Sequence, residues 1–122
     1  MTPFGSLDEV RPHRIWDGVV GRVVAGERLT FVVVELEANA LVPEHAHENE
    51  QIGVLASGSM RFRIGDEERL LAPGGTWRIP AQAPHEVTAG PAGAVAIEVF
   101  APPRADWDSL GRLEPSSPVW PS

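Results

Sequence analysis

Side chains that bind transition metals are concentrated in residues 43–51, the segment PEHAHENEQ. Two of the four histidines of the chain, His45 and His47, stand two positions apart there, and Gln51 follows them. Residues two apart in a β-strand point to the same face, so the three side chains converge if the strand continues through Gln51. Imidazole nitrogens and an amide oxygen are suitable ligands for a divalent transition metal. The segment therefore predicts one side of a metal site.

A third imidazole is expected from His85, which follows the stretch PAQAP at residues 80–84. Two imidazoles from one strand and one from a neighbouring strand would form a cradle for a metal ion. Each histidine also has a simpler interpretation, because a lone histidine on a strand is more often a surface residue or a satisfied core residue. An HxH pair alone is modest evidence for a metal site. His13, in the N-terminal segment, is not expected to take part.

The composition restricts the chemistry and the partners of such a site. The chain has no cysteine, which excludes disulfides, thiolate metal ligands and thiol nucleophiles. Its formal net charge of −7, from 17 acidic and 10 basic residues, makes it a poor binder of nucleic acid. No apolar run approaches a membrane span, and residues 1–10 do not resemble a signal peptide. We therefore expect a cytoplasmic protein with no nucleic-acid or membrane partner.

The elements that position these groups are expected to be short strands, because no long stretch repeats apolar residues at helical spacing. Residues 59–64 alternate between apolar and polar, and the Gly65-Asp66 pair predicts a tight turn into a returning strand. Residues 29–36 are too apolar to be half exposed, which favours a strand buried on both faces. The expected strands are residues 19–25, 29–36, 52–56, 59–64, 67–71, 77–80, 85–89 and 94–100.

The glycine and proline residues between these runs favour an all-β sandwich or barrel. Twelve glycines and twelve prolines occur in the 122 residues, many of them in short turns at fairly regular intervals. The length suits one domain. We expect an N-terminal arm at 1–14, a barrel at 15–101 and a C-terminal arm at 102–122. Because the second arm carries Trp107 and Trp120, it is expected to pack on the barrel or on a partner subunit.

These motifs, in this order, resemble the cupin superfamily over about residues 16–107. The first cupin motif contains HxH, then Glu after three or four residues, then Gly after six more. Here the HxH pair is followed by Gln51 in place of Glu and by Gly58. The second motif runs Gly, Pro, His, and the chain supplies Gly74-Gly75, Pro80 and His85. Other positions depart from the pattern: Asn39 or Ala40 stands near the place of the opening Gly, Gly75 at that of an Asp, and Ala89 near that of a late Asn.

The resemblance implies a cupin double-stranded β-helix, a jelly-roll barrel that forms a homodimer. It also implies one divalent transition metal (Ni, Zn, Fe, Mn or Co) held by His45, His47, Gln51 and His85. Three neutral imidazoles and a neutral amide leave the charge of the ion uncompensated, which makes it a stronger Lewis acid. The ligand set therefore favours an anionic or enolisable ligand, and Lewis-acid chemistry more than oxygenation, although three-histidine oxygenase sites also exist.

A narrower resemblance connects the chain to the pectin-degradation cupins, which open the ring of unsaturated uronates released from pectin and alginate. The HxHxxxQ string and residues 98–106 (EVFAPPRAD) carry this likeness. Metallo-cupins of polyketide cyclisation have a similar ligand set. In the pectin-degradation cupins an Asp and an Arg of the terminal string lie in the active site, and Glu98 and Arg104 occupy their places here. Glu98 is one carbon longer than the Asp that it replaces.

Glu98 and Arg104 are therefore the candidate catalytic residues. Arg104 is expected to clamp a substrate carboxylate, and Glu98 to take or give a proton near the metal. The structural alternative is an ion pair between the two that anchors the last strand and the tail. Trp77, Phe62 and Met60 are expected in the barrel core rather than at the mouth of a pocket.

Three functional hypotheses follow. The first is an isomerase or lyase that acts on a small anionic carbohydrate or keto acid by Lewis-acid-assisted isomerisation or ring opening. The second is a metal-dependent dioxygenase, which iron retention and oxygen consumption would reveal. The third is a non-catalytic sugar-binding cupin, which would show saturable binding without turnover. A serine hydrolase is not expected, because no GxSxG motif is present.

Overall fold

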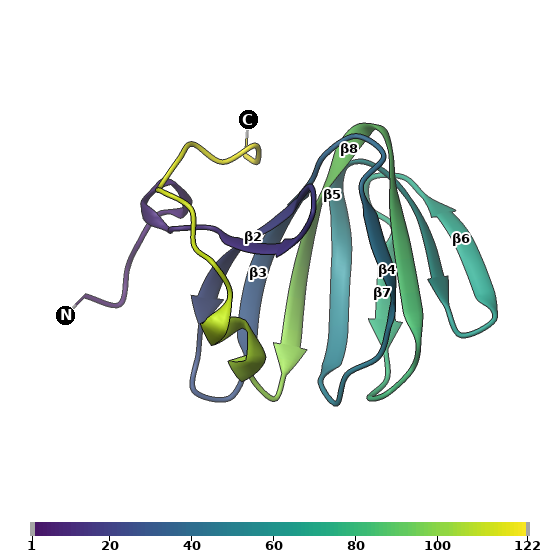
Figure 1. Ribbon diagram of the computed structural model, residues 1–122, viewed down its shortest axis with the longest axis horizontal. Coiled ribbons are helices and arrows are strands. Elements are labelled where there is room, and N and C mark those ends of the chain that lie inside the picture. The colour runs from purple at the N-terminus through teal and green to yellow at the C-terminus, as the bar shows by residue number, and fades with distance from the viewer. Residues whose placement is uncertain (1, 122) are drawn as a thin grey trace.

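Eight strands and two short 3₁₀ helices form the fold of residues 2–121, which are the residues described by the computed structural model (Figure 1). The predicted all-β class is confirmed, since these two 3₁₀ segments are the only helices in that range. No helix in the same range is long and apolar enough to cross a membrane. In chain order the elements are η1 (Leu7–Glu9), β1 (His13–Trp16), β2 (Val19–Ala25), β3 (Thr30–Leu36), β4 (Leu41–His45), β5 (Glu50–Ile64), β6 (Glu67–Leu71), β7 (Thr76–Ile79), β8 (His85–Ala101) and η2 (Ala105–Ser109).

The strands form one antiparallel sheet of order β1-β2-β3-β8-β5-β6, in which β4 also pairs with β8 and β7 with β5. The longest strands are β5 and β8, with 15 and 17 residues. The first half of β8 pairs with β4 and its second half with β3, while β5 pairs first with β7 and then with β6. Because both strands change neighbours halfway, the sheet curves around an enclosed core (Figure 1).

Each long strand continues through a place where the sequence predicted a break. Two strands were expected on either side of Gly58, and two more on either side of residues 90–93, but each pair is one strand. The β5–β8 register is irregular between Leu55 and Ser57, and again between Gly58 and Met60. Such irregularities let a strand bend without ending. Glycine therefore marks a bend here instead of a turn, which sequence pattern alone does not distinguish.

Replacing Gly58 by alanine is expected to destabilise the barrel by about 3 kcal/mol. Gly58 has φ +79°, and a Cβ there would overlap the carbonyl oxygen of Gly93 on the adjacent strand. The left-handed backbone costs roughly 1–2 kcal/mol for an L-residue, and forced displacement of a packed backbone adds about 1–3 kcal/mol. Urea unfolding checks the value. Gly65→Ala is the matched control, because Gly65 has φ +58° but no neighbour within 4 Å of its Cβ position. Equal losses in both variants would contradict the role of the close contact.

Two strands, β1 and β4, were not predicted. β4 contains Pro43, and none of its residues is fully buried, so it lacks the apolar alternation that indicates a strand. β1 begins at His13, inside the segment assigned to the N-terminal arm, and pairs only with β2 in the sheet. Both strands contribute residues to the cavity beside the predicted metal ligands, so their position matters for the site.

Both arms are held against the outer face of β2 and β3 by Arg22, which is 2% exposed. Its guanidinium forms an ion pair with Glu35, with 2.9 Å between Nε and Oε2. It also donates to the carbonyl of Leu7 (3.3 Å), to the carbonyl of Ser116 (2.8 Å) and to that of Ser117 (3.2 Å). A buried charge is tolerated when it is paired and its donors are satisfied. The C-terminal arm therefore packs on the barrel of its own chain.

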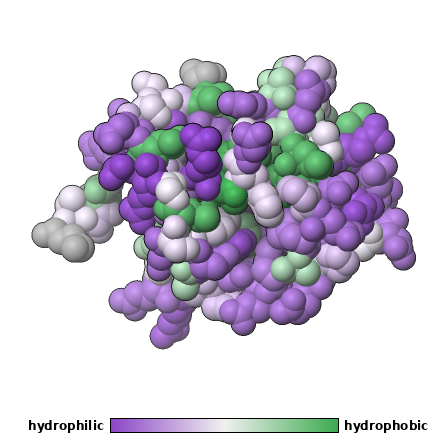
Figure 2. All heavy atoms as spheres, in the orientation of Figure 1, coloured by the Kyte–Doolittle hydropathy of each residue, from purple (hydrophilic) through white to green (hydrophobic). Residues whose placement is uncertain are grey.

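Met60, Phe62 and Trp77 lie in the core, as predicted. The surface, in contrast, is largely hydrophilic on the face shown in Figure 2, with a few groups of hydrophobic side chains. The core is formed by inward-facing side chains from both halves of the curved sheet. Its buried members are Val19, Val32, Val34, Leu36, Leu55, Met60, Phe62, Trp77, Ile79, Val87, Ala89, Ala94, Ala96, Phe100 and Trp107.

His13 is buried away from the other histidines. It forms a β-bridge with Arg112 of the C-terminal arm, and its Nδ1 has no hydrogen-bond partner among residues 2–121. Burial and then the positive charge of Arg112 lower its pKa, against the opposing charge of Asp108. His13 is therefore neutral in the folded protein at neutral pH.

We expect His13→Gln to make the metal-free protein less sensitive to acid. Because the folded-state pKa lies below the ordinary value of about 6.5, the unfolded chain binds the proton first, and stability falls as the pH drops below that value. The wild type should lose up to about 1 kcal/mol more unfolding free energy than the variant between about pH 7.5 and 5.5. Urea titrations at both pH values measure this difference. The other histidines are present in both proteins, so their contribution cancels, and equal acid losses would contradict the prediction.

Candidate metal centre

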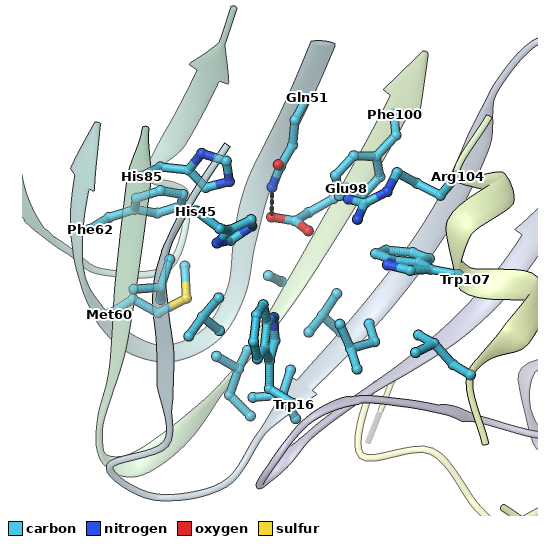
Figure 3. Close-up of a pocket in the computed structure, with 18 of the residues that line it drawn as sticks. Trp16, His45, Gln51, Met60, Phe62, His85, Glu98, Phe100, Arg104 and Trp107 are labelled. Atoms are coloured by element: carbon cyan, nitrogen blue, oxygen red, sulfur yellow. Dashed lines mark hydrogen bonds between the residues drawn. The ribbon is translucent and has the colours of Figure 1, made fainter. Parts of the chain in front are cut away.

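Three imidazole rings meet at one end of the barrel. The candidate ligand atoms of His45, His47 and His85 all lie within 4.8 Å of one another. The ring centroids of His45 and His85 are 4.2 Å apart, and those of His47 and His85 are 5.0 Å apart. His45 ends β4 and pairs directly with His85, which begins β8, so the sheet register itself brings these two rings together (Figure 3).

The strand assumed to run from His45 to Gln51 does not exist in that form. β4 ends at His45, His47 lies in the connecting loop, and Gln51 belongs to β5. The equal parity of the three positions is therefore not the cause of their convergence. A short loop between β4 and β5 turns the chain, so that His47 and Gln51 reach the same centre from a second direction.

All three imidazoles are oriented by the backbone. The Nδ1 atom of His45 lies 2.8 Å from the carbonyl oxygen of Pro43, that of His47 lies 2.9 Å from Asn49 O, and that of His85 lies 2.9 Å from Ala83 O. A carbonyl oxygen can only accept, so each Nδ1 carries the proton and donates it. In a neutral ring with this tautomer, Nε2 keeps a free lone pair, as a metal ligand needs.

The Nε2 atom of His85 is the clearest sign that a group is meant to bind here. It is buried and has no hydrogen-bond partner among residues 2–121. A buried polar atom without a partner costs about 1–3 kcal/mol, so native proteins rarely leave one unless a ligand or water satisfies it. Burial also lowers the pKa of His85 to about 4, so the ring is neutral and its lone pair is available at neutral pH.

Gln51 adds a second observation that fits a cation. Its Oε1 lies 3.1 Å from Nε2 of His47, while its Nε2 donates to Oε1 of Glu98 at 2.8 Å (Figure 3). Burial, followed by the charge of Arg104, lowers the pKa of His47, so this imidazole is neutral and has only one N–H. Because that proton lies on Nδ1, where it is donated to Asn49 O, two acceptors face each other across 3.1 Å. A metal ion bound to both would remove this repulsion, so the residues present fit a divalent metal.

Glu98 fixes the orientation of the Gln51 amide. Its Oε1 also accepts from the indole Nε1 of Trp77 at 3.1 Å, so this oxygen is satisfied by two donors. Its Oε2 forms no hydrogen bond with the described residues and points into the adjoining cavity (Figure 3). Burial raises the pKa of Glu98 to about 7, although the hydrogen bonds from Gln51 and Trp77 oppose the rise.

The contact between Trp77 and Glu98 depends on Gly53. In the sheet, Gly53 on β5 pairs with Trp77 on one side and with Glu98 on the other. A Cβ at position 53 would lie 2.6 Å from two atoms of the indole ring. The indole therefore crosses β5 in the space that a side chain would fill. Trp77 was predicted only as a core residue, and nothing in its local sequence indicates this role.

The structural alternative, an ion pair between Arg104 and Glu98, is not formed in the described part of the chain. Arg104 pairs instead with Asp106, through Nε at 3.0 Å and Nη2 at 2.9 Å. The guanidinium carbon also lies 4.8 Å from the centroid of Phe100 and 4.3 Å from that of Trp107. Arg104 lowers the pKa of Asp106, so the pair is ionised. The Nη1 atom has no hydrogen-bond partner within residues 2–121, and Asp106 was not foreseen from the sequence.

One cavity of about 250 Å³ connects these groups. His45, Gln51, His85, Glu98 and Arg104 all line it, and His47 belongs to the imidazole group at its end. Five of the six site residues predicted from the sequence therefore border a single space. The arrangement provides a cation site, an acid–base group and a cationic side chain around one small ligand.

A family model and a curated relative both match this chain. The family model described as "Cupin domain" matches residues 32–100. A curated relative, the pectin degradation protein KdgF of Dickeya dadantii (strain 3937), is 29% identical over 102 residues, which is 82% of this chain and 93% of that protein.

Solved structures agree in fold. KdgF from Halomonas sp. superposes with a TM-score of 0.78 at 27% identity, covering 87% of this chain and 98% of that one. An RmlC-like cupin from Shewanella frigidimarina NCIMB 400 superposes with a TM-score of 0.80 at 20% identity, covering 88% and 96%. The second likeness concerns the fold alone, whereas the first extends over nearly the whole of a relative with the same name as the curated one.

Proposed function

We propose, on the basis that this chain belongs to the cupin family, that it is a metal-dependent enzyme which isomerises or ring-opens a small anionic substrate. The candidate substrates are an anionic carbohydrate of the unsaturated-uronate type or a keto acid. One observation carries the proposal: three imidazoles meet beside the free carboxylate oxygen of Glu98 on one cavity, and the buried Nε2 of His85 has no hydrogen-bond partner among residues 2–121.

The metal would be held by Nε2 of the three histidines and by Oε1 of Gln51. When bound, a divalent ion with these neutral ligands supplies Lewis-acid polarisation of a substrate carbonyl or hydroxyl. Nickel, zinc, iron, manganese and cobalt all suit such a nitrogen and amide-oxygen set. The backbone carbonyls that fix each Nδ1 keep the rings in position whichever ion binds.

Two side chains would act on the substrate itself. Arg104 lines the cavity, and its Nη1, which has no hydrogen-bond partner among residues 2–121, would bind a substrate carboxylate. Asp106 and the rings of Phe100 and Trp107 hold the guanidinium in place. Glu98 would take or give a proton at Oε2, because its Oε1 is occupied by Gln51 and Trp77.

The likeness to KdgF supports the uronate as the first substrate to test. The curated relative is described as a pectin degradation protein, and the likeness covers most of both chains. The resemblance of residues 98–106 to the terminal string of the pectin-degradation cupins adds to this, with Glu98 in the place of an Asp.

The experiment is elemental analysis of the purified protein followed by an assay on an unsaturated uronate. Near-stoichiometric metal together with ring opening is the expected result. Metal without ring opening would remove the uronate assignment and direct the search to other small acids and to oxygen uptake. If the protein holds no metal after gentle purification and reloading, the proposal of a metal-dependent enzyme is wrong.

Arg104→Ala should weaken binding of a carboxylate ligand by about 10-fold to 100-fold and leave the metal content unchanged. The loss follows from a charge-assisted hydrogen bond worth roughly 1.5–3 kcal/mol. Isothermal titration of the metal-loaded protein measures it. Arg61→Ala, which removes a side chain that is 63% exposed and outside the cavity, is the matched control. Loss of metal from the Arg104 variant would instead show that Arg104 maintains the structure of the centre.

A further inference from the structure

We infer that the ligand of this site has an apolar body attached to its acidic head, so that its class is a small hydrophobic keto acid rather than a polyhydroxylated sugar acid. The inference rests on the proposed function only in taking the metal centre as the place where the head binds. It follows from the distribution of polar and apolar side chains along the cavity.

On the side of the cavity formed by β3, β8 and β5, the inward-facing side chains change from polar to apolar with distance from the imidazoles. Glu98 is the last polar side chain along β8 before the cavity wall becomes apolar. Two residues before Glu98 on β8 is Ala96, which pairs with Val34 of β3. Two residues after Val34 on β3 is Leu36, which pairs with Val19 of β2. All four apolar residues are buried, and all four line the cavity.

The opposite side of the cavity changes in the same direction. His85 is the polar side chain at the metal-binding end of β8. Two positions further along β8 is Val87, which pairs with Val42 on one side and with Phe62 on the other. Met60 also lines the cavity, two residues before Phe62 on β5, and Figure 3 shows Phe62 beside the imidazoles and Met60 farther from them. The cavity therefore has one polar end and an apolar chamber beyond it.

Few polar groups remain for a ligand with many hydroxyls. Thirteen of the nineteen described lining residues are apolar or aromatic, and none of the nineteen is Ser, Thr, Tyr, Asn or Lys. Apart from the indole N–H groups of Trp16 and Trp107, the polar lining is restricted to the metal-binding end. The lining backbone of β2, β3, β5 and the second half of β8 is already paired in the sheet. The polar lining residues are His45, Gln51, His85, Glu98, Arg104 and Asp106.

The energetic consequence separates the two ligand classes. A buried ligand hydroxyl without a partner weakens binding by about 5-fold or more, since such a group costs at least about 1 kcal/mol. Each methylene moved from water to an apolar wall strengthens binding about fourfold. The volume of about 250 Å³ lies below the range of roughly 300–1,000 Å³ that is usual for drug-sized ligands. The chamber therefore suits a short branched or single-ring body.

Binding of a graded series of acids to the metal-loaded protein tests the inference. The probes are pyruvate, 4-methyl-2-oxopentanoate and phenylpyruvate, which share one 2-oxo acid head, and galacturonate as the sugar acid. Isothermal titration, or quenching of tryptophan fluorescence, gives the affinities without any need for turnover. We expect an increase of at least about tenfold from pyruvate to 4-methyl-2-oxopentanoate, and we expect galacturonate to bind no more tightly than pyruvate.

A shape-conserving substitution locates the effect. Val34→Thr places a hydroxyl in the chamber wall and should reduce the affinity for 4-methyl-2-oxopentanoate several-fold, while pyruvate, which has no apolar body, binds as before. Val54→Thr is the matched control, because Val54 is on β5 and does not line the cavity. Elemental analysis verifies that both variants retain metal.

The outcomes distinguish this inference from the proposed function. Hydrophobic acids that bind tightly without turnover support the inference and count against the enzymatic proposal. Tight binding and ring opening of a uronate overturn the inference while the proposed function stands. Equal affinity across the 2-oxo acids, or no binding by any of them, also overturns the inference.

Discussion

His85→Ala is expected to abolish stoichiometric metal binding while the barrel remains folded. The variant removes the proposed ligand whose buried Nε2 has no partner among residues 2–121, and it leaves only two imidazoles and one amide of the proposed set. The affinity for a divalent ion should fall by more than about a hundredfold, because even removal of a residue that only supports a ligand costs about 10-fold to 100-fold. The lost packing costs about 2–3 kcal/mol, offset in part because an unsatisfied buried nitrogen disappears.

Elemental analysis after metal loading measures the effect, and urea unfolding shows whether the variant is folded. His13→Gln is the matched control, since His13 is equally buried but lies outside the imidazole group. It should keep its full metal content. Full metal content in the His85 variant would show that the ligand assignment is wrong.

Glu98→Gln should reduce turnover by about a hundredfold or more, which is the usual contribution of a positioned general acid or base. The substitution keeps the size of the side chain and an oxygen that can accept from Gln51 and Trp77. An amide cannot take up and release a proton as the carboxylate would at Oε2. Metal content and ligand affinity should therefore change little, so that the loss appears in kcat rather than in KM.

Steady-state kinetics together with metal analysis provide the test, on whichever substrate is found to turn over. Glu37→Gln, at an exposed position, controls for the loss of one negative charge. Unchanged kcat would restrict Glu98 to holding the Gln51 amide in place. Loss of metal from the variant would also indicate that Glu98 only holds the Gln51 amide in place, because the orientation of that amide would then depend on the charge of the Glu98 carboxylate.

The group of candidate ligands could be found from the sequence because these residues are rare and closely spaced. Three of the four histidines and Gln51 fall in two short motifs, so their types alone indicated a metal. The geometry behind them could not be predicted in the same way. The parity argument assumed one strand from His45 to Gln51, whereas a loop joins two strands there. β4 itself was missed, because its proline and its exposure hide the strand pattern.

Contacts that depend on the register between strands distant in the sequence could not be predicted from the sequence alone. The hydrogen bond from Trp77 to Glu98 exists because β7, β5 and β8 align both residues with Gly53. The pairing of Arg104 with Asp106 depends on a 3₁₀ turn that no local pattern indicated. In both cases the residue type was visible, but its partner was set by packing between segments.

The backbone carbonyls behind the three histidines have a consequence for how such a protein can evolve. Every amino acid carries a main-chain carbonyl, so substitution at Pro43, Asn49 or Ala83 leaves the acceptor for each Nδ1 in place. Mutation of these residues therefore does not remove the groups that fix the histidine tautomers, whereas mutation of a side-chain acceptor would. The wall of the cavity is free to diversify toward new ligands, and a lineage can change its substrate while inheriting the same metal centre.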